Sequence, residues 1–231
     1  MSDSPPSAHK QPVSAFSPFY GCAIIAMAMF VFVGIIAWSL YSLLKQDEAI
    51  AAFAQSQPAT LPALPEAGPA DEALLQRLKQ ARSNPAESQI SLSLEDLNRL
   101  LRLAPDGDYG SYRDMLRAVS MDPQRGVIVA QVSLPLNPLP LVGKSKRYLN
   151  GRVSYRPESP ESGLDARVSA VEVEGRQVPE GFVSAMATWT LLGPYRQQPE
   201  VLGLLERVVK VEVLPQALRL HLRAAATEPK L

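Results

Sequence analysis

The 231-residue chain has little of the chemistry that catalytic and metal sites need. Its single cysteine excludes an internal disulfide and any cysteine-built zinc or iron–sulfur site. Its two histidines, His9 and His221, are too few for a multi-histidine metal cage. The 23 basic and 23 acidic residues cancel, so the net charge gives no reason to expect a nucleic-acid partner. We therefore expect no metal, no cofactor and no nucleic acid.

Catalytic motifs are also missing. The chain has neither a G-x-x-x-x-G-K-[ST] loop nor a G-x-G-x-x-G turn after a predicted strand. A Ser–His–Asp triad needs an oriented histidine, but His9 lies in a polar tail and His221 alternates with leucines in a predicted strand. The acidic pairs Glu95–Asp96 and Glu172–Glu174 are placed as solvated surface. The sequence predicts a protein that is not an enzyme.

Charge is absent from one long stretch, residues 11–44. Within it, residues 23–38 (AIIAMAMFVFVGIIAW) are all apolar or glycine, and residues 19–44 exceed the ~20 residues that cross a bilayer. Phe19 and Tyr20 at one end, and Trp38 and Tyr41 near the other, have the spacing of interfacial aromatic belts. This pattern predicts a transmembrane signal anchor over residues 19–44.

A cleaved signal peptide is the alternative to a retained anchor. Ala52-Phe53-Ala54 has the small-residue pattern of a cleavage site. The apolar run is longer than a 7–15-residue signal core, however, and three charged residues stand before the site: Lys45, Asp47 and Glu48. We favour retention and keep cleavage after Ala54 as the alternative.

The orientation in the membrane depends on the size of the domain after the anchor. Lys10 on one side and Lys45 on the other give nearly equal counts of basic residues. A long downstream domain is translocated largely regardless of its charge. We therefore expect a cytoplasmic N-terminus and an extracytoplasmic C-terminal domain.

Composition divides the rest of the chain. Residues 1–18 are rich in Ser and Pro and are expected to be a disordered tail. Residues 45–70 are a Pro/Ala-rich segment expected to be a semi-extended tether, although its start, residues 47–54, could continue the helix. Residues 71–224 are expected to form the soluble domain, and residues 225–231 a tail.

Helical and strand periodicities alternate along the soluble domain. Helical spacing is found over residues 71–82, over residues 93–103 behind a capping box of Ser93 and Asp96, after Pro179 and again from residue 199. Strand alternation predicts hairpins over residues 115–135, 147–175 and 210–223. The expected fold class is α+β, an antiparallel sheet packed with amphipathic helices behind a transmembrane helix.

Two groups of residues are candidates for binding. The first group consists of basic residues that follow a Pro/Leu-rich loop: Lys144, Lys146, Arg147 and Arg152. They could contact anionic lipid headgroups, or they could be a solvated surface. The second group consists of apolar residues on two predicted helices: Phe182, Met186, Trp189, Leu97 and Leu101. They could contact an apolar ligand or a partner, or they could belong to the hydrophobic core.

Several segments together resemble a known family. They are residues 91–101 (SLSLEDLNRLL), Tyr148-Leu149-Asn150, residues 173–179 (VEGRQVP) and the terminal VKVEVLPQALRLHL. Their order resembles the YpmS-like family of single-pass bacterial envelope proteins. The resemblance implies a BPI-like lipid-binding fold, in which a strongly bent sheet wraps a long helix around an apolar groove, and it supplies no catalytic residues. The Pro-rich linker and the helix from Leu74 to Ala81 depart from the family pattern.

Two functions are compatible with these observations. The first is a membrane-tethered envelope protein that binds lipid or another apolar ligand. The alternative is a scaffold or accessory subunit that holds a partner protein at the membrane. A hydrolase would need a cleft in which carboxylates converge.

Overall fold

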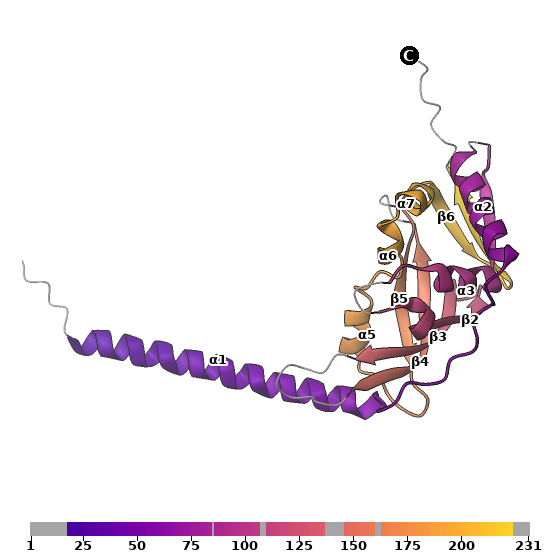
Figure 1. Ribbon diagram of the computed structural model, residues 1–231. Helices are drawn as coiled ribbons and strands as arrows, with labels where there is room; N and C mark the ends of the chain where they lie inside the picture. Colours follow the sequence, from indigo (N-terminus) through magenta and orange to yellow (C-terminus); the bar gives the residue numbers. More distant parts are fainter. Residues whose placement is uncertain (1–17, 85, 107–109, 137–145, 160–162, 224–231) are drawn as a thin grey trace, which may run out of the picture. The chain divides into compact units, whose positions relative to one another are not determined.

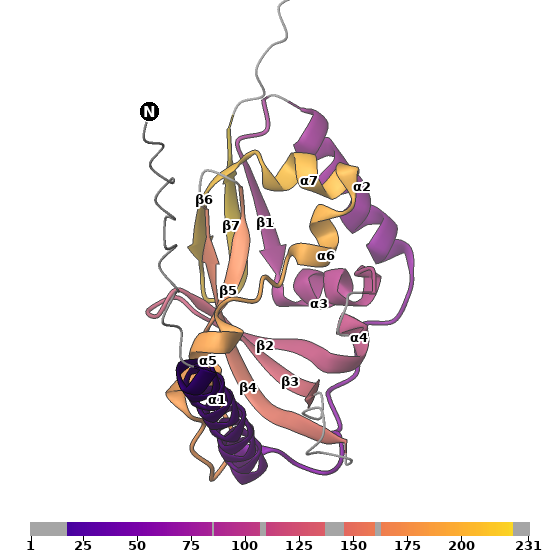
Figure 2. The ribbon, with the colours of Figure 1, turned by 90° about the vertical axis from the view of Figure 1, so that its left-hand side faces the viewer.

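The computed structural model describes residues 18–84, 86–106, 110–136, 146–159 and 163–223, and it divides the chain into two compact units, Met1–Gln46 and Asp47–Leu231. Figures 1 and 2 together label the elements. The helices are α1 (Pro18–Phe53), α2 (Pro69–Ser83), α3 (Leu94–Leu103), α4 (Tyr112–Met115), α5 (Glu180–Met186), α6 (Gly193–Arg196) and α7 (Pro199–Leu205). The strands are β1 (Gln89–Ser93), β2 (Leu116–Asp122), β3 (Val127–Leu136), β4 (Arg147–Glu158), β5 (Asp165–Glu172), β6 (Val208–Val213) and β7 (Ala217–Leu222).

Helix α1 carries the apolar run of the sequence. Among the described residues, Phe19–Phe53 is the helix that is long and apolar enough to cross a membrane. Its large side chains, such as Phe30 and Trp38, are exposed, as a lipid-facing surface requires. By length and composition, α1 is compatible with a single-pass anchor or a signal sequence.

The second unit, Asp47–Leu231, is an α+β domain with two antiparallel sheets. The four-stranded sheet has the order β2-β3-β4-β5, so its two hairpins are adjacent. The turn between β2 and β3 forms because the Asp122 carboxylate accepts hydrogen bonds from the Gln124 and Arg125 amides, at 3.0 Å each. Gly126 completes the turn with φ +65°. Both hairpins lie where strand alternation predicts them.

The three-stranded sheet has the order β1-β7-β6. Strands β6 and β7 are the predicted terminal hairpin, and β1 pairs with β7 from Gln89↔His221 to Ser93↔Ala217. The expectation of one antiparallel sheet therefore becomes two. The physical reason is that β1, from the start of the domain, adds its backbone hydrogen bonds to the edge of the last hairpin.

Helices α2, α3, α6 and α7 lie on one side of the three-stranded sheet (Figure 2). Helix α3 begins at the predicted capping box: the Asp96 amide donates to Ser93 Oγ at 3.0 Å, and the Ser93 amide donates to the Asp96 carboxylate at 2.9 Å. The helix expected after Pro179 ends earlier than the apolar pattern indicates, since α5 stops at Met186.

Two apolar clusters form the core of the domain. One lies on the four-stranded sheet and includes the fully buried Val132 and Val153. The other lies between the three-stranded sheet and α2 and α7, and includes Leu74 and Leu204. Leu97 of α3 packs against both clusters. Helix α3 therefore stands at the junction of the two halves of the domain.

Residues 54–68, which we call the strap, link α1 to α2 and belong to neither a helix nor a sheet. The strap begins beside β4, where Gln55 and Tyr148 exchange backbone hydrogen bonds of 2.9 and 2.8 Å. It then meets side chains from one face of the four-stranded sheet: the Ala59 amide donates to Ser133 Oγ and to Asn150 Oδ1, at 3.1 Å each.

The amide group of Asn150 is fully used in holding the strap. Its Oδ1 accepts from Ala59 and from the Ser133 hydroxyl, and its Nδ2 donates to Gln55 Oε1 and to the Gln57 carbonyl, both at 2.8 Å. Asn150 is only 7% exposed, so these four bonds satisfy a group that would otherwise be costly to bury.

Further contacts hold both ends of the strap. The end of α1 is fixed by the fully buried Phe53, whose ring lies 4.8 Å from that of Phe182, and by Arg176, which donates to the Ala54 carbonyl at 2.9 Å. Farther along, Arg117 and Arg99 donate to the carbonyls of Pro62 and Glu66. Composition predicts a semi-extended tether over residues 45–70, and the contacts above hold the strap, residues 54–68 of that segment, against the domain.

Candidate functional site

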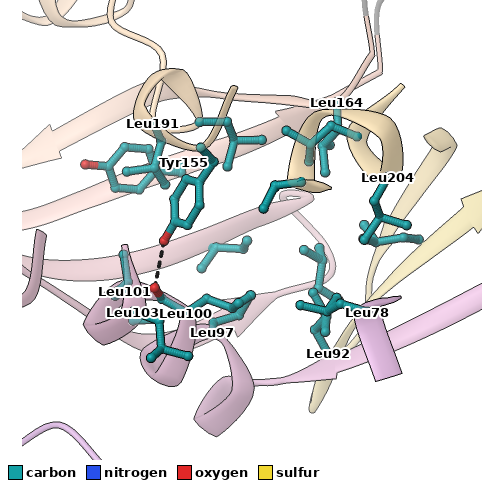
Figure 3. A pocket seen from close by; sticks show the side chains of 18 of the residues that line it. Leu78, Leu92, Leu97, Leu100, Leu101, Leu103, Tyr155, Leu164, Leu191 and Leu204 are labelled. Carbon is teal, nitrogen blue, oxygen red and sulfur yellow. Dashed lines mark hydrogen bonds between the residues drawn. The ribbon is translucent and has the colours of Figure 1, made fainter. Parts of the chain in front are cut away.

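An apolar cavity of about 200 Å³ lies where the two core clusters meet, and we call it the leucine cavity. Fifteen of its 22 described lining residues are leucines, which contribute from both sheets and from α2, α3 and α7 (Figure 3). The non-leucine lining residues are Ala118, Ile128, Ala130, Tyr155, Tyr195, Gln198 and Val201.

The cavity exists because two neighbouring strands carry small side chains at facing positions. Ala118 of β2 pairs with Ala130 of β3, and Ala130 pairs with Val153 of β4. Directly paired residues point to the same face of a sheet. Two methyl groups therefore stand where larger strand residues would fill the space below α3.

Helix α3 provides the wall opposite these alanines. Leu97, Leu100 and Leu101 all line the cavity from this helix. Asn98 fixes the helix to β2, because its side chain donates to the Ala118 carbonyl at 2.8 Å and accepts from the Ala118 amide at 2.9 Å. Asn98 thus satisfies the outer backbone groups of Ala118 in an edge strand and joins α3 to β2.

Polar groups in the cavity wall are few and uncharged. The Tyr195 hydroxyl donates to the Leu100 carbonyl at 2.8 Å, the dashed line in Figure 3. Burial raises the pKa of both Tyr155 and Tyr195 above the usual range, with a smaller contribution from Tyr112. Both tyrosines are neutral at physiological pH, and none of the described residues that line the cavity is charged.

A second cavity of about 370 Å³ adjoins the first, and we call it the tryptophan cavity. Leu116, Tyr155 and Leu191 line both cavities, so this layer of side chains separates them. Trp189 lines the tryptophan cavity, and so does Tyr112, whose pKa is raised to about 12 by burial and then by the Asp165 carboxylate.

The apolar candidates from the sequence fall in three places. Leu97 and Leu101 line the leucine cavity, whereas Met186 and Trp189 line the tryptophan cavity. Phe182 lines neither and instead packs against Phe53. The structure therefore brings two pairs of these residues to adjoining cavities, and the fifth packs against Phe53 within the second unit.

The basic candidates are not gathered into one site. Lys144 lies outside the described residues, and Lys146 and Arg152 are exposed. Arg147 is half-buried and binds both oxygens of the Asp47 carboxylate, at 2.7 and 3.2 Å. Its guanidinium is therefore paired with a carboxylate of the same domain.

No group of three or more His, Cys, Asp or Glu side chains is placed to hold a metal in the part of the chain that the structure describes. His221 projects from β7, where its Nε2 lies 3.2 Å from Glu212 Oε2. The pKa of Glu212 is lowered to about 2, first by the hydrogen bond from Lys210 and then by His221. This cluster lies on strands β6 and β7, and neither His221 nor Glu212 is among the described residues that line the two cavities.

The sequence interpretation missed the residues that create the cavity. Ala118 and Ala130 lie in the predicted hairpin, and small residues at inward positions of two adjacent strands are a recognisable signal. Their pairing register, however, follows from the turn and a bulge between Ala118 and Ser120, which composition does not reveal. Leu116, Leu164 and Leu204 come from β2, from the residue before β5 and from α7, and they meet only in the folded domain.

Comparison with known proteins identified no relative from which a function could be transferred. No family model matches the chain, and no match was found among the curated proteins or the solved structures. The function of the two cavities is therefore inferred from their geometry and chemistry.

Proposed function

We propose that the domain binds an apolar ligand, such as the acyl chain of a lipid, in the leucine cavity. The observation that carries this proposal is a cavity of about 200 Å³ whose described walls are leucine-rich and uncharged. An apolar cavity of this size does not hold water well, because water there would lack hydrogen-bond partners. A hydrocarbon chain would instead gain the dispersion contacts that the walls offer.

The adjoining tryptophan cavity supports a ligand longer than a small molecule. Ligand sites commonly occupy about 300–1,000 Å³. The leucine cavity alone, at about 200 Å³, is smaller than this range, and a single layer of side chains separates it from the tryptophan cavity of about 370 Å³. Rotamer changes at Leu116 or Leu191 would join them. The resemblance to the YpmS-like family implies one strongly bent sheet that surrounds an apolar groove. In this proposal the two sheets together surround the ligand instead.

We further propose that the domain works at a membrane surface. Helix α1 would be a retained anchor with its N-terminus in the cytoplasm, and the domain would lie outside, where the exposed Lys146 and Arg152 could contact anionic headgroups. Alkaline phosphatase fused after Leu231 should be active if this orientation holds. An inactive fusion that is fully expressed would reverse the orientation.

The central experiment fills the cavity. Ala130→Leu directs a larger apolar side chain from β3 into the leucine cavity, and Ala118→Leu does so from β2. Each full-length variant and the wild type would be purified in the same detergent, and co-purifying lipid would be extracted and quantified by mass spectrometry. We expect a lipid or other apolar species bound to the wild type that is lost from both variants.

Ala73→Leu is the matched control, since it makes the same change at an exposed position of α2. Lipid that surrounds α1 is common to all four proteins and cancels in the comparison. Equal amounts of every apolar species in all four proteins would contradict the proposal and favour the scaffold alternative.

A further inference from the structure

The leucine cavity has a neighbour at its other end, a groove of about 650 Å³ between α2 and α7. Leu75, Leu78, Val201 and Leu204 line both the cavity and the groove. In Figure 3, Leu78 and Leu204 lie at one end of the cavity, whereas Tyr155 and Leu191 lie at the other. The groove, the leucine cavity and the tryptophan cavity therefore follow one another in series.

The groove differs from the cavity in carrying positive charge. Helix α2 presents Leu75, Leu78, Lys79 and Arg82, spaced i, i+3, i+4 and i+7, so that two leucines are followed by two cations on one face. Lys79 is exposed and Arg82 is half-buried. The Arg82 stem lies along α7, with its Cδ 3.6 Å from the position that a Cβ on Gly203 would take.

These two cations have no counter-ion in the described part of the chain. The other described residues that line the groove are apolar or neutral, and no ion pair there involves Lys79 or Arg82. Arg77 on the same helix, by contrast, pairs with Asp96 at 2.9 Å. The mouth of the apolar cavity is thus the place where an anionic group would find two unpaired cations.

We propose that the ligand is a single-chain amphiphile with an anionic headgroup, such as a fatty acid, bound in one orientation. The headgroup lies in the groove between Lys79 and Arg82, and the chain passes the layer of Leu75, Leu78, Val201 and Leu204 into the leucine cavity. The methyl end points toward the tryptophan cavity. This inference rests on the proposed function and adds the headgroup charge, the entrance and the direction of the chain.

Trp189 offers a reporter at the far end of this path. The chain has two tryptophans, and Trp38→Phe in α1 leaves Trp189 alone. The full-length Trp38→Phe protein would be reconstituted in phosphatidylcholine vesicles and titrated with three probes. They are dodecanoate brominated at its terminal carbon, dodecanoate brominated next to the carboxylate, and dodecanol brominated at its terminal carbon. Bromine quenches tryptophan fluorescence only at short range, so it reports the position of the labelled carbon.

We expect the terminally brominated dodecanoate to quench Trp189 and the isomer brominated beside the carboxylate to quench it little. Lys79→Gln with Arg82→Gln should weaken binding of the terminally brominated dodecanoate by roughly three- to tenfold, as expected for the loss of two partly exposed ion pairs. Binding of the brominated dodecanol should not change. Arg125→Gln, which removes an exposed cation from the β2–β3 turn, is the control and should leave both affinities unchanged.

The outcomes separate the orientation from the function. Equal quenching by the two dodecanoates, or equal loss of dodecanoate and dodecanol binding in the double variant, would overturn the charged entrance while leaving an apolar site in place. Quenching that persists in Ala130→Leu would show that the probes reach Trp189 from the bilayer or the surface, and would overturn both inferences. Absence of quenching by all three probes would overturn the proposed function itself.

Discussion

The two faces of the four-stranded sheet are built from the same strands but hold their neighbours by different forces. The inner face, with Ala118, Ala130 and Val153, is apolar and leaves a cavity under α3. The outer face, with Ser133 and Asn150, binds the strap through hydrogen bonds. Apolar packing is non-directional and tolerates space, whereas hydrogen bonds specify the position of a single chain segment. The sheet thus combines an adaptable face with a fixed one.

The largest test of this comparison replaces adjacent residues of β4 that point to opposite faces. Val153→Asn should lower the free energy of unfolding by about 3–5 kcal/mol, because it buries an amide without partners and removes a fully buried side chain. Arg152→Asn, at an exposed outer position, should change it by less than about 0.5 kcal/mol. Urea unfolding in detergent, followed by circular dichroism, measures both. If the two variants lose similar amounts of unfolding free energy, the apolar packing at Val153 does not contribute more to stability than the exposed position of Arg152, which contradicts the comparison.

A second test concerns the outer face alone. Asn150→Ala removes all four bonds of the amide group and should cost about 2 kcal/mol, whereas Ser133→Ala should cost about 1 kcal/mol because Ala59 keeps its bond to Asn150. Hydrogen exchange of the Ala59 amide should accelerate more in Asn150→Ala than in Ser133→Ala. Unchanged exchange at Ala59 in Asn150→Ala would show that the strap is held by other contacts.

The smallest effect is a pH dependence at the far end of the strap. Asp71 accepts from the Gly68 amide at 2.9 Å and pairs with Arg102 and Arg99 of α3. Arg102 is the largest of the causes that lower the pKa of Asp71 from 3.8 to about 2. Because the pKa is lower in the folded state, the stabilisation is complete above about pH 4 and is lost as the pH falls toward 2.

Thermal unfolding of wild type and Asp71→Asn between pH 6 and pH 2 measures this contribution. The wild type should be the more stable protein at pH 6, and the difference should shrink below about pH 4. A difference that stays constant down to pH 2 would contradict a stabilising role for the ionised carboxylate. Glu212→Gln is a useful comparison, since the pKa of Glu212 is also lowered to about 2, but by hydrogen bonds from Lys210 and then from His221 in the three-stranded sheet.

Local sequence signals anticipated much of the fold. The charge-free run over residues 11–44 lies largely within α1, the Ser93–Asp96 pair caps α3, and alternating residues form the predicted hairpins. These features depend on residues within a few positions of each other, so composition and spacing determine them. The sequence interpretation also selected Leu97 and Leu101, which line the leucine cavity, because helical spacing places them on one apolar face.

The attachment of the strap could not be read in the same way. Proline and alanine between two charged segments are typical of a tether, and nothing near residues 54–68 indicates otherwise. The strap is held by Ser133, Asn150 and Arg117, which lie 55 to 95 positions later in the chain than the strap residues that they bind. Partners at such separations are brought together only by the pairing of β2, β3 and β4.

Residue type and short-range spacing were enough to specify the apolar helix, the antiparallel hairpins and the scarcity of catalytic and metal-binding groups. Long-range packing had to specify the rest: β1 completes a second sheet, the strap crosses one face of the first, and Ala118 and Ala130 face the leucines of α3 across a cavity. Space between side chains depends on how separate elements pack, so the small residues of β2 and β3 leave a cavity only because the strand register and α3 place them opposite leucines.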